Sequence, residues 1–413
     1  MALASNTLLT NDLITRQALR VLRNQFVLAS RSLRNVDDLF GKTGLKAGAT
    51  VRVRVPVRYV SATGAAVQKN NSAETNTSIT LTQRNIGMGF ASIDRTLSID
   101  DFNDRFIKPA MAQLASDIDA DGFALYAKAQ NLVTPGSYSA GSPAAFTGTD
   151  VSTLRPFLDA KARMTEKAVP ADGDMYVAVT PAASAGLVDG LKSLFQSASE
   201  IADQYKRGLM GMAAGFQFVE AQTLPTFTAG TRAATGATVN GNTTGSSIVL
   251  ASAGNALTYV AGDTFTIAGV YSINPLTRAA TNKLQIFTVQ ATQTSSGGGA
   301  VTLSILPSIN ITSPNQTVSA QAASGAAIVM TSAASVATDV NIAWHKSAFL
   351  VAFADLETDL PGAEASKMTD PETGITLRMV GQHNVETDET VYRLDVLYGW
   401  AIVRGEHVCR VQA

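Results

Sequence analysis

Residues 263–288 read DTFTIAGVYSINPLTRAATNKLQIFT, and this stretch determines how the whole chain is organised. Two short segments rich in β-branched and aromatic residues, 264–267 and 284–288, are separated by Gly, Ser and Asn residues typical of turns, which predicts two strands. The surrounding residues 222–338 are poor in charge, although 16% of the whole chain is charged. Their charged side chains are Arg232, Asp263, Arg278 and Lys283. The sharpest boundaries in the sequence therefore lie near residues 225 and 340.

This charge-poor stretch has two interpretations, a disordered linker or a folded β domain. Short strand-like segments recur through it, separated by turn residues. They cover residues 247–250, 264–267, 284–288, 301–305 and 327–330. Strands spaced this closely are typical of small barrels and sandwiches. We therefore predict a small β-barrel domain over residues 226–339.

The chain on both sides of residues 226–339 has a different pattern. Before them lie a predicted helix at 152–167 and a short apolar strand at 175–179. After them come a helix-like apolar run at 342–353 and an alternating segment at 375–379. A chain that resumes its earlier composition after a foreign block is typical of a domain inserted at a surface loop. The predicted fold class is α+β with one inserted domain.

The first 35 residues predict an amphipathic helical arm. Apolar side chains recur at spacings of three and four residues and so share one helix face. They are Leu19, Leu22, Phe26, Ala29 and Leu33. The other surface is basic and carries Arg16, Arg20, Arg23, Arg31 and Arg34. This basic face has two equally weighted interpretations, a solvated helix surface or a contact with an anionic partner.

Residues 51–59 alternate strictly between apolar and polar side chains, which is the pattern of a half-buried strand. Pro56 cannot donate to a sheet ladder, which favours an edge strand or a two-stranded ribbon. A second strand is predicted at 78–86, after a long polar stretch. Because isolated two-stranded hairpins are marginally stable in water, we expect another chain to stabilise this arm.

The longest helix of the chain is predicted at residues 98–131. Ser98 and Asp101 form a variant of the capping box, and Asp100 favours the N-terminal end of the helix dipole. Pro109 lies inside this range, so it either kinks the helix or marks its true first turn.

The sequence contains no recognisable catalytic or metal-binding pattern. Residues 40–43 match the end of a phosphate-binding loop, but Val36 stands where that loop needs a glycine. Cys409 is the single cysteine, and the histidines offer no zinc spacing. These histidines are His345, His383 and His407. We expect neither enzymatic activity nor a cofactor.

The chain contains no run of about 18 apolar residues that could cross a bilayer. Its first residues lack the charged start and apolar core of a secretory signal. We therefore expect a protein of cytoplasmic origin with no membrane partner.

Three passages resemble the coat proteins of P22-like tailed phages, which share the HK97 fold. One is the start Met1-Ala2-Leu3 ahead of a helical arm. Another is GMAAGF at 211–216, which leads through Leu224-Pro225 into the charge-poor block, and the last is VLYGWAIVR at 396–404. The order of elements is also similar over the whole chain, from the basic arm and hairpin to the inserted β domain and the C-terminal sheet.

The resemblance implies an HK97-like division of the chain. The parts are an N-terminal arm at 1–47, an extended-loop (E-loop) hairpin at 48–90, a spine helix with the peripheral domain and the first part of the axial domain at 91–225, the inserted β-barrel domain at 226–339, and a return to the core at 340–413.

The resemblance also implies a function and partners. It implies a non-enzymatic major capsid protein that assembles in the host cytoplasm into hexamers and pentamers of an icosahedral head enclosing double-stranded DNA. The implied partners are further copies of the chain, a separate scaffolding protein, a portal protein and packaged DNA, the last contacted weakly and without sequence specificity. The implied location is the virion.

Three groups of candidate contact residues follow from the resemblance. The scaffold or DNA candidates are Arg16, Arg20, Arg23 and Arg34. The E-loop candidates for meeting carboxylates on the next subunit are Arg52, Arg54, Arg58 and Arg84. The candidates on the inserted domain are Asp263, Arg278 and Lys283. Exposed ion pairs contribute about 0–1 kcal/mol each, so they are expected to set register more than affinity.

Three alternatives belong to other classes of protein. An encapsulin-like cargo shell shares the fold but usually lacks a large β insertion. A surface-display or adhesin protein would suit the Thr/Ser-rich block but not the α/β core or the missing export signal. A soluble enzyme ranks last because the sequence offers no site.

Overall fold

The computed structural model describes residues 11–34, 50–55, 57–61, 63–65, 75–91, 103–134, 151, 153–191, 211–370, 374–384 and 389–412. The chain forms two compact units, each built from segments that are distant in sequence. The first unit combines Met1–Arg54, Asn76–Gly122 and Phe349–Ala401. The second unit combines Val55–Thr75, Phe123–Ala348 and Ile402–Ala413.

The first unit is a sheet in the order β1-β19-β22-β21-β20, with β4 also paired to β22. Its strands are β1 (Leu33–Arg34), β4 (Thr82–Ala91), β19 (Phe349–Ala354), β20 (Glu364–Thr369), β21 (Thr376–Asn384) and β22 (Glu389–Ile402). A separate ribbon pairs β2 (Thr50–Val55) with β3 (Thr75–Thr80). The helices are α1 (Asn11–Gln25), the 3-10 turn η1 (Ala29–Arg31), the π-helix η3 (Asn103–Ile107) and α3 (Lys108–Phe123).

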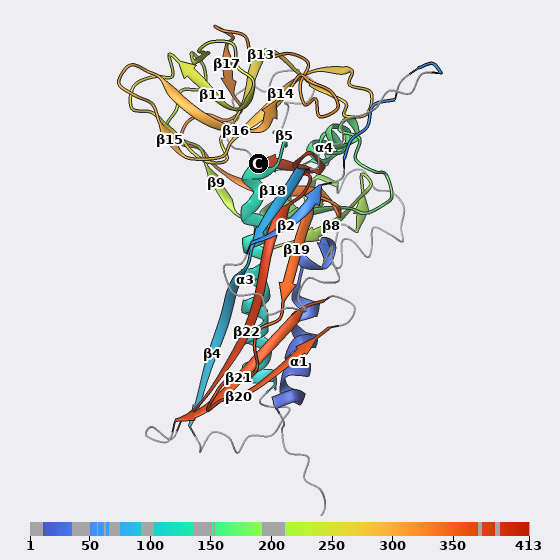
Figure 1. The fold of residues 1–413 in the computed structure, drawn as a ribbon, viewed down its shortest axis with the longest axis vertical. Helices are drawn as coiled ribbons and strands as arrows, with labels where there is room; N and C mark the ends of the chain where they lie inside the picture. Colours follow the sequence, from blue (N-terminus) through green and yellow to red (C-terminus); the bar gives the residue numbers. More distant parts are fainter. Residues whose placement is uncertain are drawn as a thin grey trace, which may run out of the picture. The chain divides into compact units, whose positions relative to one another are not determined.

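The core of the first unit lies between its sheet and its two α-helices (Figure 1). Leu377 of β21 and Leu394 of β22 are buried together with Leu22 of α1 and Met111 of α3. Burying each of these side chains stabilises the fold by about 1.5–3 kcal/mol. Figure 1 shows β4, in blue, running beside β22, in red, and the two strands pair in antiparallel register along their length. The second hairpin strand is thereby joined to the C-terminal sheet.

Most predicted elements of the first unit are confirmed, with shifted bounds. The arm helix ends at Gln25. The α-helical part of the long helix starts at Lys108, so Pro109 lies in its first turn, one of the two predicted roles. Ser98, Asp100 and Asp101 lie outside the described residues. The strand predicted at 78–86 is split at Leu81, which is buried against Ala354 and Leu397, because β3 pairs with β2 and β4 pairs with β22.

Gly399 of β22 lies against the end of β3, where space is tight. A Cβ at this position would lie 2.5 Å from Cγ2 of Ile79 and 2.7 Å from the carbonyl oxygen of Thr80. We therefore expect Gly399→Ala to lower the free energy of unfolding of the first unit by about 1–3 kcal/mol, measured by urea denaturation. Gly87→Ala on β4 is the control, since a Cβ there meets nothing within 4 Å. Equal losses in both variants would contradict the steric explanation.

The second unit contains a sheet in the order β5-β23-β18-β6-β8-β7, with β9 also paired to β18. Its strands are β5 (Asn131–Val133), β6 (Met175–Val179), β7 (Met212–Ala213), β8 (Phe216–Glu220), β9 (Thr226–Thr228), β18 (Ala337–His345) and β23 (Val408–Gln412). Its helices are η4 (Ala124–Lys128), α4 (Arg155–Glu166), α5 (Pro181–Leu191) and η5 (Gly405–His407). Among the helices that the structure describes, none is long and apolar enough to span a membrane.

The charge-poor residues form a second sheet in this unit, in the order β10-β11-β16-β14-β13-β17, beside the small pair β12-β15 (Figure 1). The strands are β10 (Thr238–Val239), β11 (Gly245–Ala251), β12 (Thr258–Tyr259), β13 (Thr264–Ile273), β14 (Ala280–Val289), β15 (Gln293–Thr294), β16 (Val301–Ile309) and β17 (Ile328–Met330). All five strands predicted from sequence are present, most of them longer than expected. The stretch is folded.

One prediction in the second half of the chain is wrong. The helix-like run at 342–353 forms β18 and β19, joined by a turn at Lys346 and Ser347. Every residue of β19 is buried, so the apolar and polar alternation of a half-buried strand is missing. A continuous apolar run of this length cannot be distinguished from a buried helix by periodicity.

Candidate interaction surfaces

The exposed face of α1 carries Arg16, Arg20 and Arg23, while Ala18 and Leu22 on its other face are buried. Arg23 also lies 3.4 Å from the carboxylate of Asp370. The three arginines form a basic row along the helix, as the heptad-like spacing predicts.

Arg34 differs from the three arginines of α1. It is half-buried, and its Nε donates to the carbonyl of Ala29 at 3.0 Å. Burial lowers the pKa of its guanidinium. Arg34 therefore supports the turn that follows α1.

Asp119 of α3 also binds the turn that follows α1. Its carboxylate accepts hydrogen bonds from the backbone N–H groups of Val27 (2.6 Å), Leu28 (3.1 Å) and Ala29 (3.1 Å). Burial raises the pKa of Asp119 to about 6, although the three N–H donors act against that rise. This one side chain links the end of α1 to the long helix.

The four arginines predicted to lie on the E-loop occupy different surroundings. Arg52 and Arg54 lie on the exposed side of β2. Arg58, which follows β2, pairs with Glu406 of η5 inside the second unit. Arg84 of β4 is bound inside the first unit. The sequence placed these residues in one group, and the structure divides them.

Arg84 is bound by several acceptors from its own unit. Its Nη2 lies 2.8 Å from Oδ1 of Asp121, its Nε lies 2.9 Å from the hydroxyl of Tyr398, and its Nη1 lies 3.4 Å from Asp117. The Tyr398 hydroxyl donates to Asp121 at 2.5 Å, and burial together with that carboxylate raises the pKa of Tyr398. We predicted carboxylates on the next subunit for Arg84. The structure provides them on α3 of the same chain, so Arg84 anchors β4 to the long helix.

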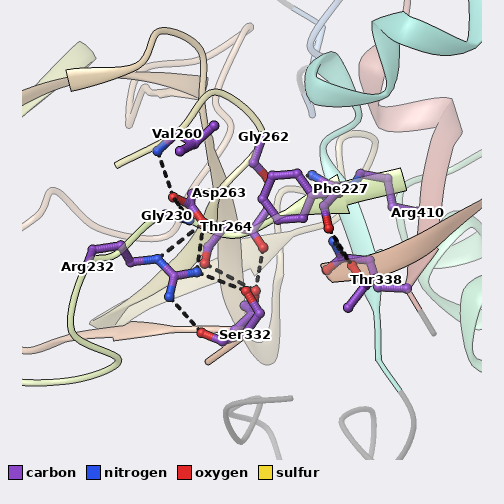
Figure 2. A network of polar contacts seen from close by, with 12 residues as sticks. Phe227, Gly230, Arg232, Val260, Gly262, Asp263, Thr264, Ser332, Thr338 and Arg410 are labelled. Atoms are coloured by element: carbon purple, nitrogen blue, oxygen red, sulfur yellow. Dashed lines mark hydrogen bonds and ion pairs between the residues drawn. The ribbon is translucent and has the colours of Figure 1, made fainter. Parts of the chain in front are cut away.

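Figure 2 shows a buried ion pair between Arg232 and Asp263, whose side chains are both 0% exposed. Nη2 of Arg232 lies 2.7 Å from Oδ1 of Asp263, and Nη1 donates to the carbonyl of Ser332 at 2.8 Å. Asp263 also accepts from the backbone N–H groups of Val260 (2.8 Å) and Gly230 (3.3 Å). The prediction that Asp263 contacts another subunit is corrected here, because this carboxylate has no exposed surface and is saturated inside the chain.

Arg410 of β23 joins the charge-poor sheet to the neighbouring sheet (Figure 2). Its Nη1 donates to the carbonyl of Gly262 at 2.8 Å, and its guanidinium lies 5.0 Å and 5.1 Å from the ring centroids of Tyr126 and Phe227. Burial lowers the pKa of Arg410 to about 10. The cation is therefore stabilised by one carbonyl and two aromatic faces, and the negative charge of Asp263 adds to this stabilisation.

Polar contacts on α4 and η4 hold β14 as well. Lys283 pairs with Glu166, and the buried Nζ of Lys167 donates to Gln285 at 2.9 Å. The side chain of Gln290 donates to the carbonyl of Ala127 at 2.9 Å. With Arg232 and Asp263 buried, the charges of this block are directed largely toward its own chain.

A chain of hydrogen bonds joins two histidines near η5. Nε2 of His345 lies 2.9 Å from Asp172, and the hydroxyl of Ser347 lies 2.7 Å from Nδ1 of His345 and 2.8 Å from Nδ1 of His407. The backbone N–H of Ser347 also donates to Nδ1 of His345, which assigns the ring proton of His345 to Nε2. Burial lowers the pKa of His407 to about 4. Within the described residues, no group of His, Cys, Asp or Glu side chains is arranged to hold a metal ion.

A family model described as "P22 coat protein - gene protein 5" matches residues 1–411. The chain belongs to the P22 coat protein family. A comparison with curated proteins finds no match. Similar solved structures include a chain of Mycobacterium phage Che8 (12% identity, TM-score 0.46, covering 94% of this chain and 90% of that one). The capsid of Ralstonia phage GP4 (9%, 0.45, 94% and 88%) and that of the cyanophage P-SCSP1u (12%, 0.44, 100% and 92%) are also similar.

The family membership confirms several predictions. This coat protein is a phage major capsid protein, a structural and non-enzymatic subunit of an icosahedral shell, located in the virion. Its mixed α+β fold class is confirmed as well. The encapsulin-like and surface-display alternatives are not favoured. The domain bounds, the inserted barrel and the contact residues stay predictions.

Two structural side chains of the coat protein were missed from sequence. Asp119 lies on the helix stripe of Met111 and Ala115, and a carboxylate on an apolar stripe is a readable sign of a buried acceptor. Arg410 interrupts the apolar run of β23, but its partners Tyr126, Phe227 and Gly262 are far away in sequence. No local pattern could have identified them.

Proposed function

We propose that this coat protein assembles into hexamers and pentamers that close into a phage head around double-stranded DNA. Membership of the P22 coat protein family carries this proposal. The ribbon β2-β3 supports it, because a two-stranded ribbon is marginal alone and offers unpaired edges to another chain. We place assembly in the host cytoplasm.

The E-loop contact is proposed for Arg52 and Arg54, which lie exposed on β2. Arg58 and Arg84 are bound by carboxylates of their own chain, so we assign them to holding two parts of the E-loop, the segment after β2 and strand β4, on their own subunit. Arg52 and Arg54 would meet carboxylates on a neighbouring subunit and set the register of the two chains.

The basic row of α1, Arg16, Arg20 and Arg23, is proposed to contact a separate scaffolding protein. Packaged DNA is the second anionic neighbour, contacted through phosphates without sequence specificity. A portal protein completes the proposed set of partners. Arg34 supports its own turn and is the weakest of the four candidates.

We propose that residues 226–339 are a small β-barrel domain inserted into the second unit. An isolated bridge between Thr238 and Ala327 brings the first strand of the sheet order next to the segment that leads into the last. The entry strand β9 and the start of β18 pair with each other, from Thr226 with Asp339 to Thr228 with Ala337. Adjacent entry and exit strands are what an insertion at a surface loop requires.

Electron microscopy of the purified coat protein, alone and co-expressed with its scaffolding protein, tests the assembly proposal. We expect closed particles from the parent chain and a large loss of closed particles from Arg52→Glu/Arg54→Glu. The two introduced carboxylates would be repelled by the carboxylates proposed on the neighbouring subunit. Lys128→Glu, at another exposed position, is the control. Monomers and dimers alone from the parent under both conditions would refute assembly, and normal particles from the double variant would refute the E-loop contact.

A further inference from the structure

We infer that Arg278, together with Glu406, is a positioning residue that holds the part of the E-loop just past strand β2, residues 58–59, on its own subunit. Nη2 of Arg278 donates to the carbonyl oxygen of Tyr59 at 3.0 Å, and Glu406 pairs with the side chain of Arg58. Two consecutive E-loop residues just past β2 are thus held by residues from two distant regions of the sequence. Arg278 binds the backbone carbonyl of Tyr59, and Glu406 binds the side chain of Arg58.

Arg278 is presented by a closely bonded turn at the tip of the β13-β14 hairpin. Its backbone N–H donates to the carbonyl of Asn274 at 2.7 Å, and the N–H of Asn274 donates to the carbonyl of Ala279 at 3.0 Å. The side-chain oxygen of Asn274 accepts from the N–H of Leu276 at 2.9 Å. Arg278 itself has a φ of 57°, in the left-handed region. The turn therefore fixes the backbone position from which the Arg278 side chain extends.

Glu406 is held just as closely on the other side. The side chain of Asn131 donates to the carbonyl of Glu406 at 2.7 Å, and the N–H of Gln130 donates to the carbonyl of Gly405 at 3.0 Å. The Arg58 and Glu406 side chains are 26% and 15% exposed, so water screens their pairing only partly. The carboxylate is therefore a fixed acceptor for the E-loop.

The side chain of Tyr59 is left outside this arrangement, with 67% of its surface exposed. The contact at its carbonyl thus sets the direction of the backbone without using the ring. An arm ordered before it meets its partner loses less conformational entropy on binding. Through Arg278, the charge-poor block prepares the E-loop of its own subunit for binding to a neighbouring subunit. That role rests on the proposed function of the E-loop, whereas the hold itself exists in a single subunit.

The hold is tested on the monomeric full chain with a spin label at Tyr59→Cys. Cys409, the single native cysteine, is buried and its thiol is out of reach of the label. In the Arg278→Met background we expect the rotational correlation time of the label to fall several-fold, because the stem is kept and the donors are lost. Arg278→Lys restores part of the immobilisation. Lys283→Met is the matched control, since it removes a polar contact of the same hairpin that does not reach the E-loop.

An unchanged spectrum in Arg278→Met, with far-UV circular dichroism like the parent's, would overturn the inference. Equal loosening in Lys283→Met would overturn it too, because the whole hairpin would then be responsible. A mobile label combined with normal particle formation would support the hold and count against the proposed role of the E-loop in assembly. A mobile label with fewer closed particles supports both.

Discussion

Asp263→Ala is expected to lower the free energy of unfolding of the second unit by about 3–5 kcal/mol. The substitution leaves the guanidinium of Arg232 buried without its carboxylate and removes the acceptor for two backbone N–H groups. It also removes a negative charge that favours the charged form of the buried Arg410. Uncompensated buried charge is among the most destabilising changes known for a folded protein. Urea denaturation measures the loss in unfolding free energy. Hydrogen exchange in peptides from β13 and β17 shows whether the loss is local to these strands.

Two further variants distinguish loss of charge compensation from general damage. Arg232→Met/Asp263→Ala removes both partners and is expected to recover part of the loss. Lys283→Met removes a partly exposed ion pair and is expected to cost less than about 1 kcal/mol. A loss in Asp263→Ala no larger than that of Lys283→Met would contradict the importance of the buried pair.

Acid is expected to weaken the second unit through His407. Burial lowers the pKa of this imidazole to about 4 from an ordinary value of 6.5. Between these two values the unfolded state binds a proton that the folded state does not, so the contribution is complete above pH 6.5 and is lost as the pH falls toward 4. Such a difference corresponds to about 3 kcal/mol. The charged and titratable groups around His407 are Glu406, Arg404, Arg58 and His345, with Asp172 beyond His345.

The measurement is the difference in unfolding free energy between the parent and His407→Asn from pH 7 to pH 4. The side-chain amide of Asn can form a hydrogen bond with Ser347 in place of Nδ1 of His407, but it does not titrate. The difference between the parent and the variant is needed because Asp119 changes the unfolding free energy with pH in the opposite direction. Its pKa is raised to about 6, so the folded state binds the extra proton and its contribution grows as the pH falls. A difference that stays constant with pH would refute the role of His407.

The spacing of apolar residues predicted helices and strands correctly where one face of the element is exposed to solvent. Strand β16 alternates strictly between buried and half-buried or exposed positions, and the arm helix buries Leu22 while exposing Arg23, as their spacing requires. The same rule failed for residues 342–353, because β19 is buried on both faces and leaves no alternation to detect. The reliability of sequence reading thus depended on exposure to solvent.

By itself the sequence determined where the strands of the charge-poor block lie, which face of α1 is basic, and the P22-like order of elements. Only the tertiary structure decided which charges are available to another chain. Arg84 lies 314 residues from Tyr398 in sequence, yet the two form a hydrogen bond, and Asp263 finds Arg232 in the interior of its own unit. The physical reason is that the spacing of side chains specifies a face of a helix or strand, whereas an ion pair is chosen by which distant segments pack together. Arg52 and Arg54 emerge from this sorting as exposed arginines of β2, and Arg278 as a residue that binds the backbone of Tyr59.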